Sequence, residues 1–211
     1  MDRLRFHFLL FSLVVMFLLF PFFIDNLFVF NLAFSLIILS ALHAVLYDQK
    51  VFLLSSIFAF LTVVSNWLFL ISPHPLVRSL NFSLFVLFYT FVVLNLLRYI
   101  LSSKSVNSSV ISAAVSSYFL IGICWGFLYS LIETLAPNSF IFSNDLIQSH
   151  YLWPDFIYYS FVTLTTVGFG DIMPHSHLAR SLTILEAICG AFFMAILVAK
   201  LVSLYKFDHK N

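Results

Sequence analysis

The chain has 211 residues, of which 62% are hydrophobic and 9% are charged, and its mean hydropathy is +1.06. This composition excludes an ordinary soluble globular protein, so we expect an integral membrane protein without a separate soluble domain. The net charge of +1 and the short, scattered clusters of Lys and Arg argue against nucleic acid as a partner.

Six apolar runs are long enough to cross a bilayer as helices, because about 20 apolar residues span its hydrocarbon core. They cover residues 6–23, 27–47, 51–72, 79–101, 110–133 and 180–205. The first run follows Arg3 and Arg5 and so resembles a signal peptide, but no small-residue cleavage pattern comes after it. We therefore expect it to be a retained helix. Cys124 and Cys189 both lie inside apolar runs, which implies no disulfide.

A further apolar run, residues 155–165, is about eleven residues long and cannot span a bilayer. It follows a more polar stretch, residues 134–154. A short helix that leads into non-helical backbone at membrane depth indicates a re-entrant loop, whose polar groups are shielded by surrounding protein. The expected fold class is therefore an all-α membrane protein with six transmembrane helices and one re-entrant helix.

The distribution of Lys and Arg between the loops orients the chain under the positive-inside rule. With the amino terminus in the cytoplasm, only Arg78 and Arg180 fall on the outer side. The cytoplasmic side receives Arg3, Arg5, Lys50, Arg98, Lys104, Lys200, Lys206 and Lys210. We expect a multi-pass protein of the cell (inner) membrane, with both termini in the cytoplasm and the re-entrant loop entering from outside.

Residues 165–171, with the sequence TTVGFGD, have the pattern of an ion-selectivity filter. A filter strips water from an ion and replaces it with backbone oxygens, so successive carbonyls have to face one narrow axis. That arrangement needs backbone angles that most residues avoid, and Gly168 and Gly170 adopt them at little cost. Thr166 adds a hydroxyl oxygen. The segment matches the TVGYG loop known from potassium channels, with Phe169 in place of tyrosine.

The match extends over residues 110–206, which resemble the pore module of the potassium channel superfamily. The sequence YYSFVTLT before the filter resembles the pore helix of prokaryotic members, which carry an aromatic pair at the positions of Tyr158 and Tyr159. Gly190 lies 24 residues after Thr166 and resembles the hinge glycine of the inner helix, and the following AILVAKLVSLY also resembles prokaryotic relatives. The resemblance implies an outer helix, a pore helix, a filter and an inner helix, in that order.

The resemblance also implies a potassium-selective channel. One chain supplies one filter strand and a closed ring of oxygens needs four, so we expect a homotetramer in the lipid bilayer, with three further copies as partners. The ligands of dehydrated K⁺ are expected to be the carbonyls of Thr166, Val167, Gly168 and Phe169, together with the Thr166 hydroxyl. Gly170 completes the outer entrance. No cofactor other than the permeant K⁺ ions is implied.

Five residues are expected to support the filter: Thr165, Asp171, Tyr158, Tyr159 and Glu186. Phe169 lacks a hydroxyl that in many relatives bonds to aromatic residues behind the filter, but it keeps the ring that packs there, so we expect potassium selectivity to survive. Asp171 is expected to accept a hydrogen bond from Tyr158 or Tyr159 and to brace the outer mouth. The alternative for Asp171 is a solvated carboxylate that only attracts cations.

Glu186 and Lys200 are ionisable residues in the last apolar run, where either would be costly if it faced lipid. Glu186 lies four residues before Gly190, and we expect it to bond to hydroxyls or backbone behind the filter. A role at the ion cavity and a contact with a neighbouring helix are the alternatives. Lys200 is explained as a snorkelling residue at the cytoplasmic interface.

Gly190 fits either a hinge in the inner helix or a close contact between helices. Its spacing from the filter favours the hinge. Bending there would splay the cytoplasmic ends of four inner helices, which makes Ala199, Val202 and Ser203 candidates for the gate.

The chain divides into a predicted four-helix transmembrane bundle, residues 1–104, and a predicted pore domain, residues 105–211. Four helices before a pore module equal the number in a voltage-sensor domain, but residues 79–97 contain no Lys or Arg, and Arg78 and Arg98 only flank this run. Moving one charge across 100 mV changes the free energy by about 2.3 kcal/mol, so a helix without charges responds little to the membrane potential. We expect a degenerate sensor or an unrelated bundle, without strong voltage gating.

Few residues follow Tyr205, so we expect no cytoplasmic ligand-binding domain. His175 and His177 would surround the mouth of a tetramer with imidazoles able to bind protons or zinc, although a solvated loop is the simpler explanation. The alternatives to a selective channel are a less selective cation channel and a nonconducting accessory membrane subunit. A channel-derived transporter would carry four filter loops in one chain, and no catalytic or metal-ligand motif indicates an enzyme.

Overall fold

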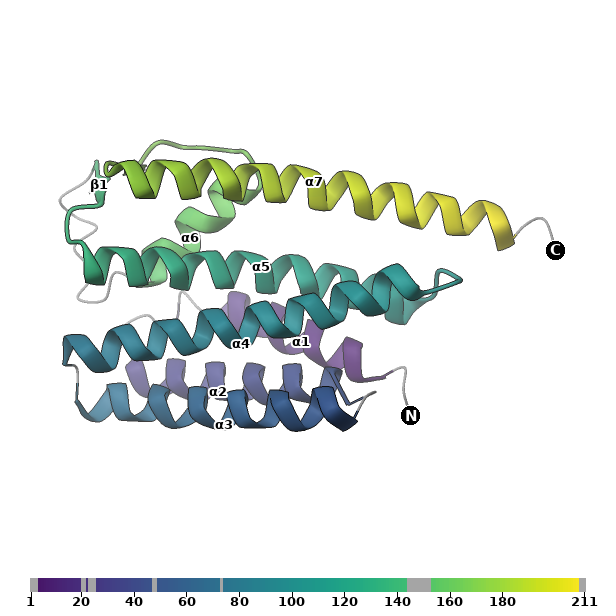
Figure 1. Cartoon of the computed structure of the whole chain (residues 1–211), viewed down its shortest axis with the longest axis horizontal. Coiled ribbons are helices and arrows are strands. Elements are labelled where there is room, and N and C mark those ends of the chain that lie inside the picture. The colour runs from purple at the N-terminus through teal and green to yellow at the C-terminus, as the bar shows by residue number, and fades with distance from the viewer. Residues whose placement is uncertain are drawn as a thin grey trace.

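A computed structural model of the chain describes residues 4–19, 22, 26–46, 49–72, 74–143 and 153–208. These residues form seven helices and two short strands (Figure 1). In chain order the elements are α1 (Leu4–Leu19), α2 (Leu27–Ala44), α3 (Gln49–Ile71), α4 (Pro75–Ser102), α5 (Ser108–Leu135), β1 (Phe140–Phe142), α6 (Trp153–Leu164), β2 (Ile172–Pro174) and α7 (His177–Asp208). The predicted all-helical fold is confirmed, with the addition of a two-stranded antiparallel sheet that the sequence did not predict.

Among the described residues, four helices are long and apolar enough to cross a membrane. These spans are Val51–Ile71, Pro75–Ser102, Ser108–Leu135 and His177–Ser203. The first two helices are shorter, since α1 has 16 residues and α2 has 18. They correspond to about 24 and 27 Å of helix, against a hydrocarbon core of about 30 Å. Four of the six predicted spans are thus confirmed by length and composition, and the crossing of the bilayer by α1 and α2 remains a prediction.

Some residues used in the sequence predictions lie outside the described part of the chain. These are Arg3, Lys210, the side chains of Lys50 and Lys206, the predicted ends of the first two runs at residues 23 and 47, and residues 144–152 of the polar stretch.

Side-chain caps mark where several helices begin. Asn26 Oδ1 accepts a hydrogen bond from the Val29 amide at 3.3 Å, and Asn107 Oδ1 accepts one from the Val110 amide at 3.0 Å. Pro75 occupies the first turn of α4, where a missing amide hydrogen costs nothing. Only residues 103–107 connect α4 to α5, so these two helices are antiparallel neighbours (Figure 1).

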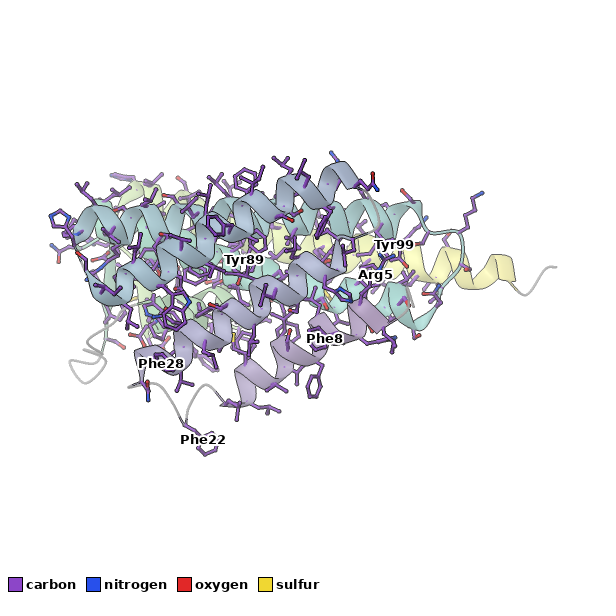
Figure 2. All side chains as sticks on the ribbon, turned by 90° about the horizontal axis from the view of Figure 1, so that it is seen from below. Arg5, Phe8, Phe22, Phe28, Tyr89 and Tyr99 are labelled. Atoms are coloured by element: carbon purple, nitrogen blue, oxygen red, sulfur yellow. The ribbon has the colours of Figure 1, made fainter. Side chains whose placement is uncertain are left out.

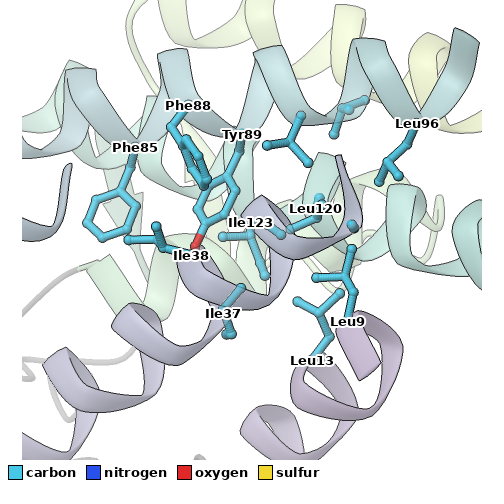
Figure 3. Packing of buried hydrophobic residues seen from close by; sticks show 14 of the residues in the cluster. Leu9, Leu13, Ile37, Ile38, Phe85, Phe88, Tyr89, Leu96, Leu120 and Ile123 are labelled. Atoms are coloured by element: carbon cyan, nitrogen blue, oxygen red, sulfur yellow. The ribbon is translucent and has the colours of Figure 1, made fainter. Parts of the chain in front are cut away.

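One hydrophobic core includes residues from α1 through α6, and Figure 3 shows part of it. At its centre the rings of Phe85 and Phe127 stack with their centroids 4.3 Å apart. Trp153, the first residue of α6, packs edge-on against Phe30 and Phe34 of α2. The first helices therefore pack directly against α6 of the same chain, and the predicted domain division at residue 104 runs through a continuous core.

Large apolar side chains also cover the outside of the bundle. Phe8, Phe22 and Phe28 point outward, and each is more than half exposed (Figure 2). Apolar surface on this scale is typical of a protein that contacts lipid or further protein rather than water.

Candidate ion-conduction site

The helix α6 has 12 residues, which is too short to cross a bilayer. Asp155 lies in its first turn, where a carboxylate interacts favourably with the helix dipole. The next residues, 165–171, have no regular secondary structure and lead into β2. The order of a short helix, an irregular segment and a long final helix is the one predicted for a re-entrant pore loop.

The backbone amides of residues 165–168 point back at the last turns of α6. The Thr165 amide donates to the Phe161 carbonyl at 3.0 Å, and the Thr166 amide donates to the Thr163 carbonyl at 2.9 Å. The Val167 and Gly168 amides share the Val162 carbonyl, at 3.0 and 3.3 Å. These contacts fix the amide side of the segment against the helix that precedes it.

The backbone angles alternate along the same segment. The φ angle is positive at Thr166 (61°), Gly168 (59°) and Gly170 (78°), but not at Val167 or Phe169 between them. Such alternation turns successive amides toward one side and successive carbonyls toward the other. Because the amides face α6, the carbonyls are left on the opposite side. The threonine at position 166 adopts a left-handed conformation that is uncommon without glycine.

The segment has little cover within one chain. Residues 165–170 are all exposed, with Phe169 at 69%. A Cβ added at Gly168 or Gly170 would meet no atom within 4 Å. The aromatic packing expected behind Phe169 is therefore not made inside a single chain.

The two adjacent tyrosines of α6 have different hydrogen-bond partners. The Tyr158 hydroxyl donates to Asp171 Oδ2 at 2.7 Å, which is one of the two hydrogen bonds considered from the sequence. The Tyr159 hydroxyl instead bonds to the Thr183 hydroxyl of α7 at 2.8 Å. Asp171 is thus tied to α6, whereas Tyr159 ties α6 to α7.

Glu186 on α7 is fully buried between α5 and α6. The Tyr129 hydroxyl of α5 donates to Glu186 Oε2 at 2.6 Å, and the Ser160 hydroxyl of α6 donates to Oε1. Ser160 Oγ also lies 2.7 Å from the carbonyl of Gly122. This geometry fits the expected bonds to hydroxyls and equally fits a contact with neighbouring helices, because Tyr129 and Ser160 lie on α5 and α6. A role of Glu186 in supporting the filter stays a prediction.

Gly190 lies against the end of α6. A Cβ at this position would be 2.2 Å from the Leu164 carbonyl oxygen, far inside van der Waals contact. Gly126 of α5 packs similarly against Ile157, where a Cβ would lie 2.7 Å from the backbone. The close-contact explanation of Gly190 therefore has direct geometric support, and the hinge remains a prediction.

A small sheet joins the segment before α6 to the segment after the filter. Phe140 pairs with Pro174 and Phe142 pairs with Ile172. The Asp171 carbonyl accepts a hydrogen bond from the Ser143 amide at 2.8 Å. The exit of the predicted filter is therefore held by β1.

The Glu133 carboxylate organises the turn that leads into β1. It accepts hydrogen bonds from the amides of Asn138, Ser139 and Phe140, at 2.7, 2.9 and 3.2 Å. The Ser139 carbonyl in turn accepts from the amides of residues 175 and 176, just after β2.

Glu133, Tyr129, Ser160 and Thr183 were not predicted as site residues from the sequence. The need for partners around a buried Glu186 was a usable signal for Tyr129 and Ser160, because both are hydroxyl residues in apolar helices. Three-residue strands carry no comparable signal.

The other predicted positions lie at the two ends of α7. His175 and His177 are exposed at its start, and Ala199, Val202 and Ser203 are exposed toward its end. Within the described part of one chain, no group of three or more His, Cys, Asp or Glu could hold a metal ion.

The carboxyl-terminal part of the chain is similar to a known protein family. Residues 117–206 match the family model described as "Ion channel", over most of α5, all of α6, the predicted filter and most of α7. No curated protein and no solved structure matches the chain. The matched family is one of ion channels and not of enzymes, and together with the apolar helices it establishes a multi-pass membrane protein. Residues 117–206 are therefore similar to the ion-channel family, and the match supports membership of the potassium channel superfamily.

Proposed function

We propose that four copies of this chain form a potassium-selective channel whose selectivity filter is residues 166–170. The observation that carries the proposal is the backbone of this segment, in which the amides of residues 166–168 bond to α6, the φ angles alternate in sign and every residue is exposed. Four such strands around one axis make a closed set of carbonyl rings.

In this tetramer the carbonyls of Thr166, Val167, Gly168 and Phe169 replace the water around K⁺. The Thr166 hydroxyl contributes at the inner end, and Gly170 forms the outer entrance. No formal charge lies among these residues, so the dipoles of the carbonyls and of the Thr166 hydroxyl coordinate the ion. The permeant K⁺ ions are the only cofactor proposed.

The distribution of burial supports several copies around an axis. In one chain, 11% of an apolar 18-residue stretch of α7 is buried, against 61% of the corresponding stretch of α5. The difference is explained if α7 is an inner helix that faces the pore and the adjacent copies of the chain. Cyclic symmetry then covers the same surface of α7 in every copy. The exposed ring of Phe169 would then pack against aromatic residues of the adjacent copy.

The proposed setting is the cell (inner) membrane, with both termini in the cytoplasm. The excess of Lys and Arg in the loops assigned to that side supports this orientation. The sheet of β1 and β2, together with Asp171, would then lie at the outer mouth.

Potassium flux into proteoliposomes tests the function. We expect the wild type to admit K⁺ and exclude Na⁺, and Gly168→Ala to abolish K⁺ flux, because alanine is strained at a φ of +59°. Leu80→Ala, at an exposed position on α4, is the matched control and should conduct normally. Equal flux of both ions would favour a less selective cation channel, and no flux would favour an accessory subunit. Either result would contradict the proposal.

We also propose that residues 1–104 form a bundle without a working voltage sensor, attached to the pore domain of residues 105–211. The helix α4 has Arg78 near its start and Arg98 near its end, with no Lys or Arg between them. Open probability is therefore expected to change little with voltage in planar bilayers. A steep voltage dependence that requires several gating charges would refute this expectation.

A further inference from the structure

A groove between α4, α5 and α7 has no part in the proposed conduction path. Its volume is about 480 Å³, within the range of ligand-binding pockets. On α7 its lining residues recur every three or four positions and so form one face of the helix. They are Cys189, Phe192, Phe193, Ile196, Leu197 and Lys200.

The groove offers almost no polar group to a ligand. The Thr90 hydroxyl lies 3.4 Å from Cys124 Sγ, which is also 3.6 Å from the Val86 carbonyl. These polar groups are therefore already partnered. Apart from Trp125, Cys189 and Lys200, the remaining walls are side chains of Leu, Ile, Val and Phe on helices long and apolar enough to cross a membrane. A flexible hydrocarbon chain suits such a surface better than a polar metabolite does.

Among the described residues that line the groove, Lys200 is the one cation, and it lies at one end. Lys200 is the last groove residue of α7, and it shares that end with Ile100 and Leu101 from the last turn of α4. The helices α4 and α7 run in the same direction, so these residues lie toward the same membrane surface (Figure 1). None of the described residues that line the groove is a carboxylate. A Lys at this position reaches for the interface, where it attracts anionic headgroups.

We propose that the groove binds an acyl chain of an anionic phospholipid, with Lys200 contacting its phosphate group. The charge of Lys200 at the end of an otherwise apolar groove favours this occupant over a second copy of the chain. The bound lipid would contact the inner helix and α4 together. The proposal depends on the membrane setting and not on the ion selectivity proposed above.

Trp125 lines the groove and reports on what fills it. The chain contains three tryptophans, so Trp67→Phe combined with Trp153→Phe leaves Trp125 as the only indole. Bromine atoms on lipid acyl chains quench indole fluorescence on contact. We expect brominated phosphatidylglycerol to bind next to Trp125, as measured by quenching, roughly fivefold more strongly than brominated phosphatidylcholine does. Lys200→Gln should reduce this preference to about one. Lys104→Gln, in the exposed α4–α5 connection, should keep it.

Three outcomes would overturn the proposal: equal quenching by the two lipids, a preference that persists in Lys200→Gln, or no quenching by either lipid. The last outcome would mean that a second copy closes the groove.

Native mass spectrometry of the assembled protein with all its tryptophans provides a second measurement if the single-tryptophan variant does not fold. Ile196→Trp, which fills the groove, should lose bound phosphatidylglycerol, whereas Leu87→Trp, on α4 outside the groove, should retain it. Equal retention by the two variants would contradict the proposal, and their ion flux reports separately on conduction.

Discussion

Replacing Gly190 with alanine is expected to abolish potassium flux and to destabilise the folded protein. The new Cβ would lie 2.2 Å from the Leu164 carbonyl oxygen, and a backbone atom cannot rotate away as a side chain does. The inner helix would have to move away from the end of α6, immediately before the predicted filter. Overpacking of this kind costs about 1–3 kcal/mol, and we expect the upper end of that range. Thermal unfolding in detergent and flux in proteoliposomes measure the two effects.

A double variant separates this close contact from a hinge. Cys189→Gly combined with Gly190→Ala keeps a flexible glycine in the same turn of α7 but also keeps the steric clash. If Gly190 acts through packing, the double variant should be as defective as Gly190→Ala alone. Recovery of flux in the double variant would support the hinge and contradict the packing account.

Replacing Glu186 with alanine is expected to weaken both the fold and the selectivity of the channel. Tyr129, which is fully buried, would lose the carboxylate that accepts its hydroxyl at 2.6 Å. A buried hydroxyl left without an acceptor costs about 1–3 kcal/mol, and the deleted side chain leaves a cavity besides. Because Ser160 on α6 bonds to the same carboxylate, the helix that precedes the predicted filter would also lose one of its links to α7. We expect a lower unfolding temperature and a smaller ratio of K⁺ to Na⁺ flux.

The matched substitutions for this prediction are Glu186→Gln and Tyr129→Phe. Glutamine keeps the side-chain volume and one acceptor oxygen. The unfolding temperature and the flux ratio of Glu186→Gln should therefore lie between those of Glu186→Ala and the wild type. Tyr129→Phe removes the hydroxyl donor together with its need for an acceptor. It should therefore lower the unfolding temperature less than Glu186→Ala does. A Glu186→Ala protein that unfolds more easily but keeps an unchanged flux ratio would contradict the role of Glu186 in filter support.

The long helices could be predicted from the sequence because their signal is local. A run of about 20 apolar residues is sufficient to indicate a membrane span, and α3, α4, α5 and α7 agree with the predicted runs to within a few residues. The described limits of α1 and α2 likewise lie within four residues of the predicted runs.

The location of the candidate site could also be predicted, because the filter motif and its neighbours are contiguous in the chain. Which tyrosine contacts Asp171 could not be predicted, since Tyr158 and Tyr159 are adjacent and only the rotation of α6 decides between them. The roles of Glu133 and β1 depend on contacts across a loop. A three-residue strand has no periodicity to detect, and its partner lies some 30 residues further along the chain.

The close contact at Gly190 illustrates the same limit. Spacing from Thr166 identified the residue but not the atom that it meets, and two explanations of a glycine were therefore open. The short distance from a Cβ at position 190 to the Leu164 carbonyl oxygen favours the close contact. A sequence pattern does not locate such a backbone atom.

The reversal potential of single channels in planar bilayers, with K⁺ on one side and an equal concentration of Na⁺ on the other, tests the central claim most directly. If residues 166–170 form a potassium filter, the current should reverse far from zero, at a voltage that opposes K⁺ efflux. Gly170→Ala, which strains a backbone φ of +78°, should abolish that current. A reversal potential at zero, or a wild-type current through the Gly170→Ala protein, would contradict the account.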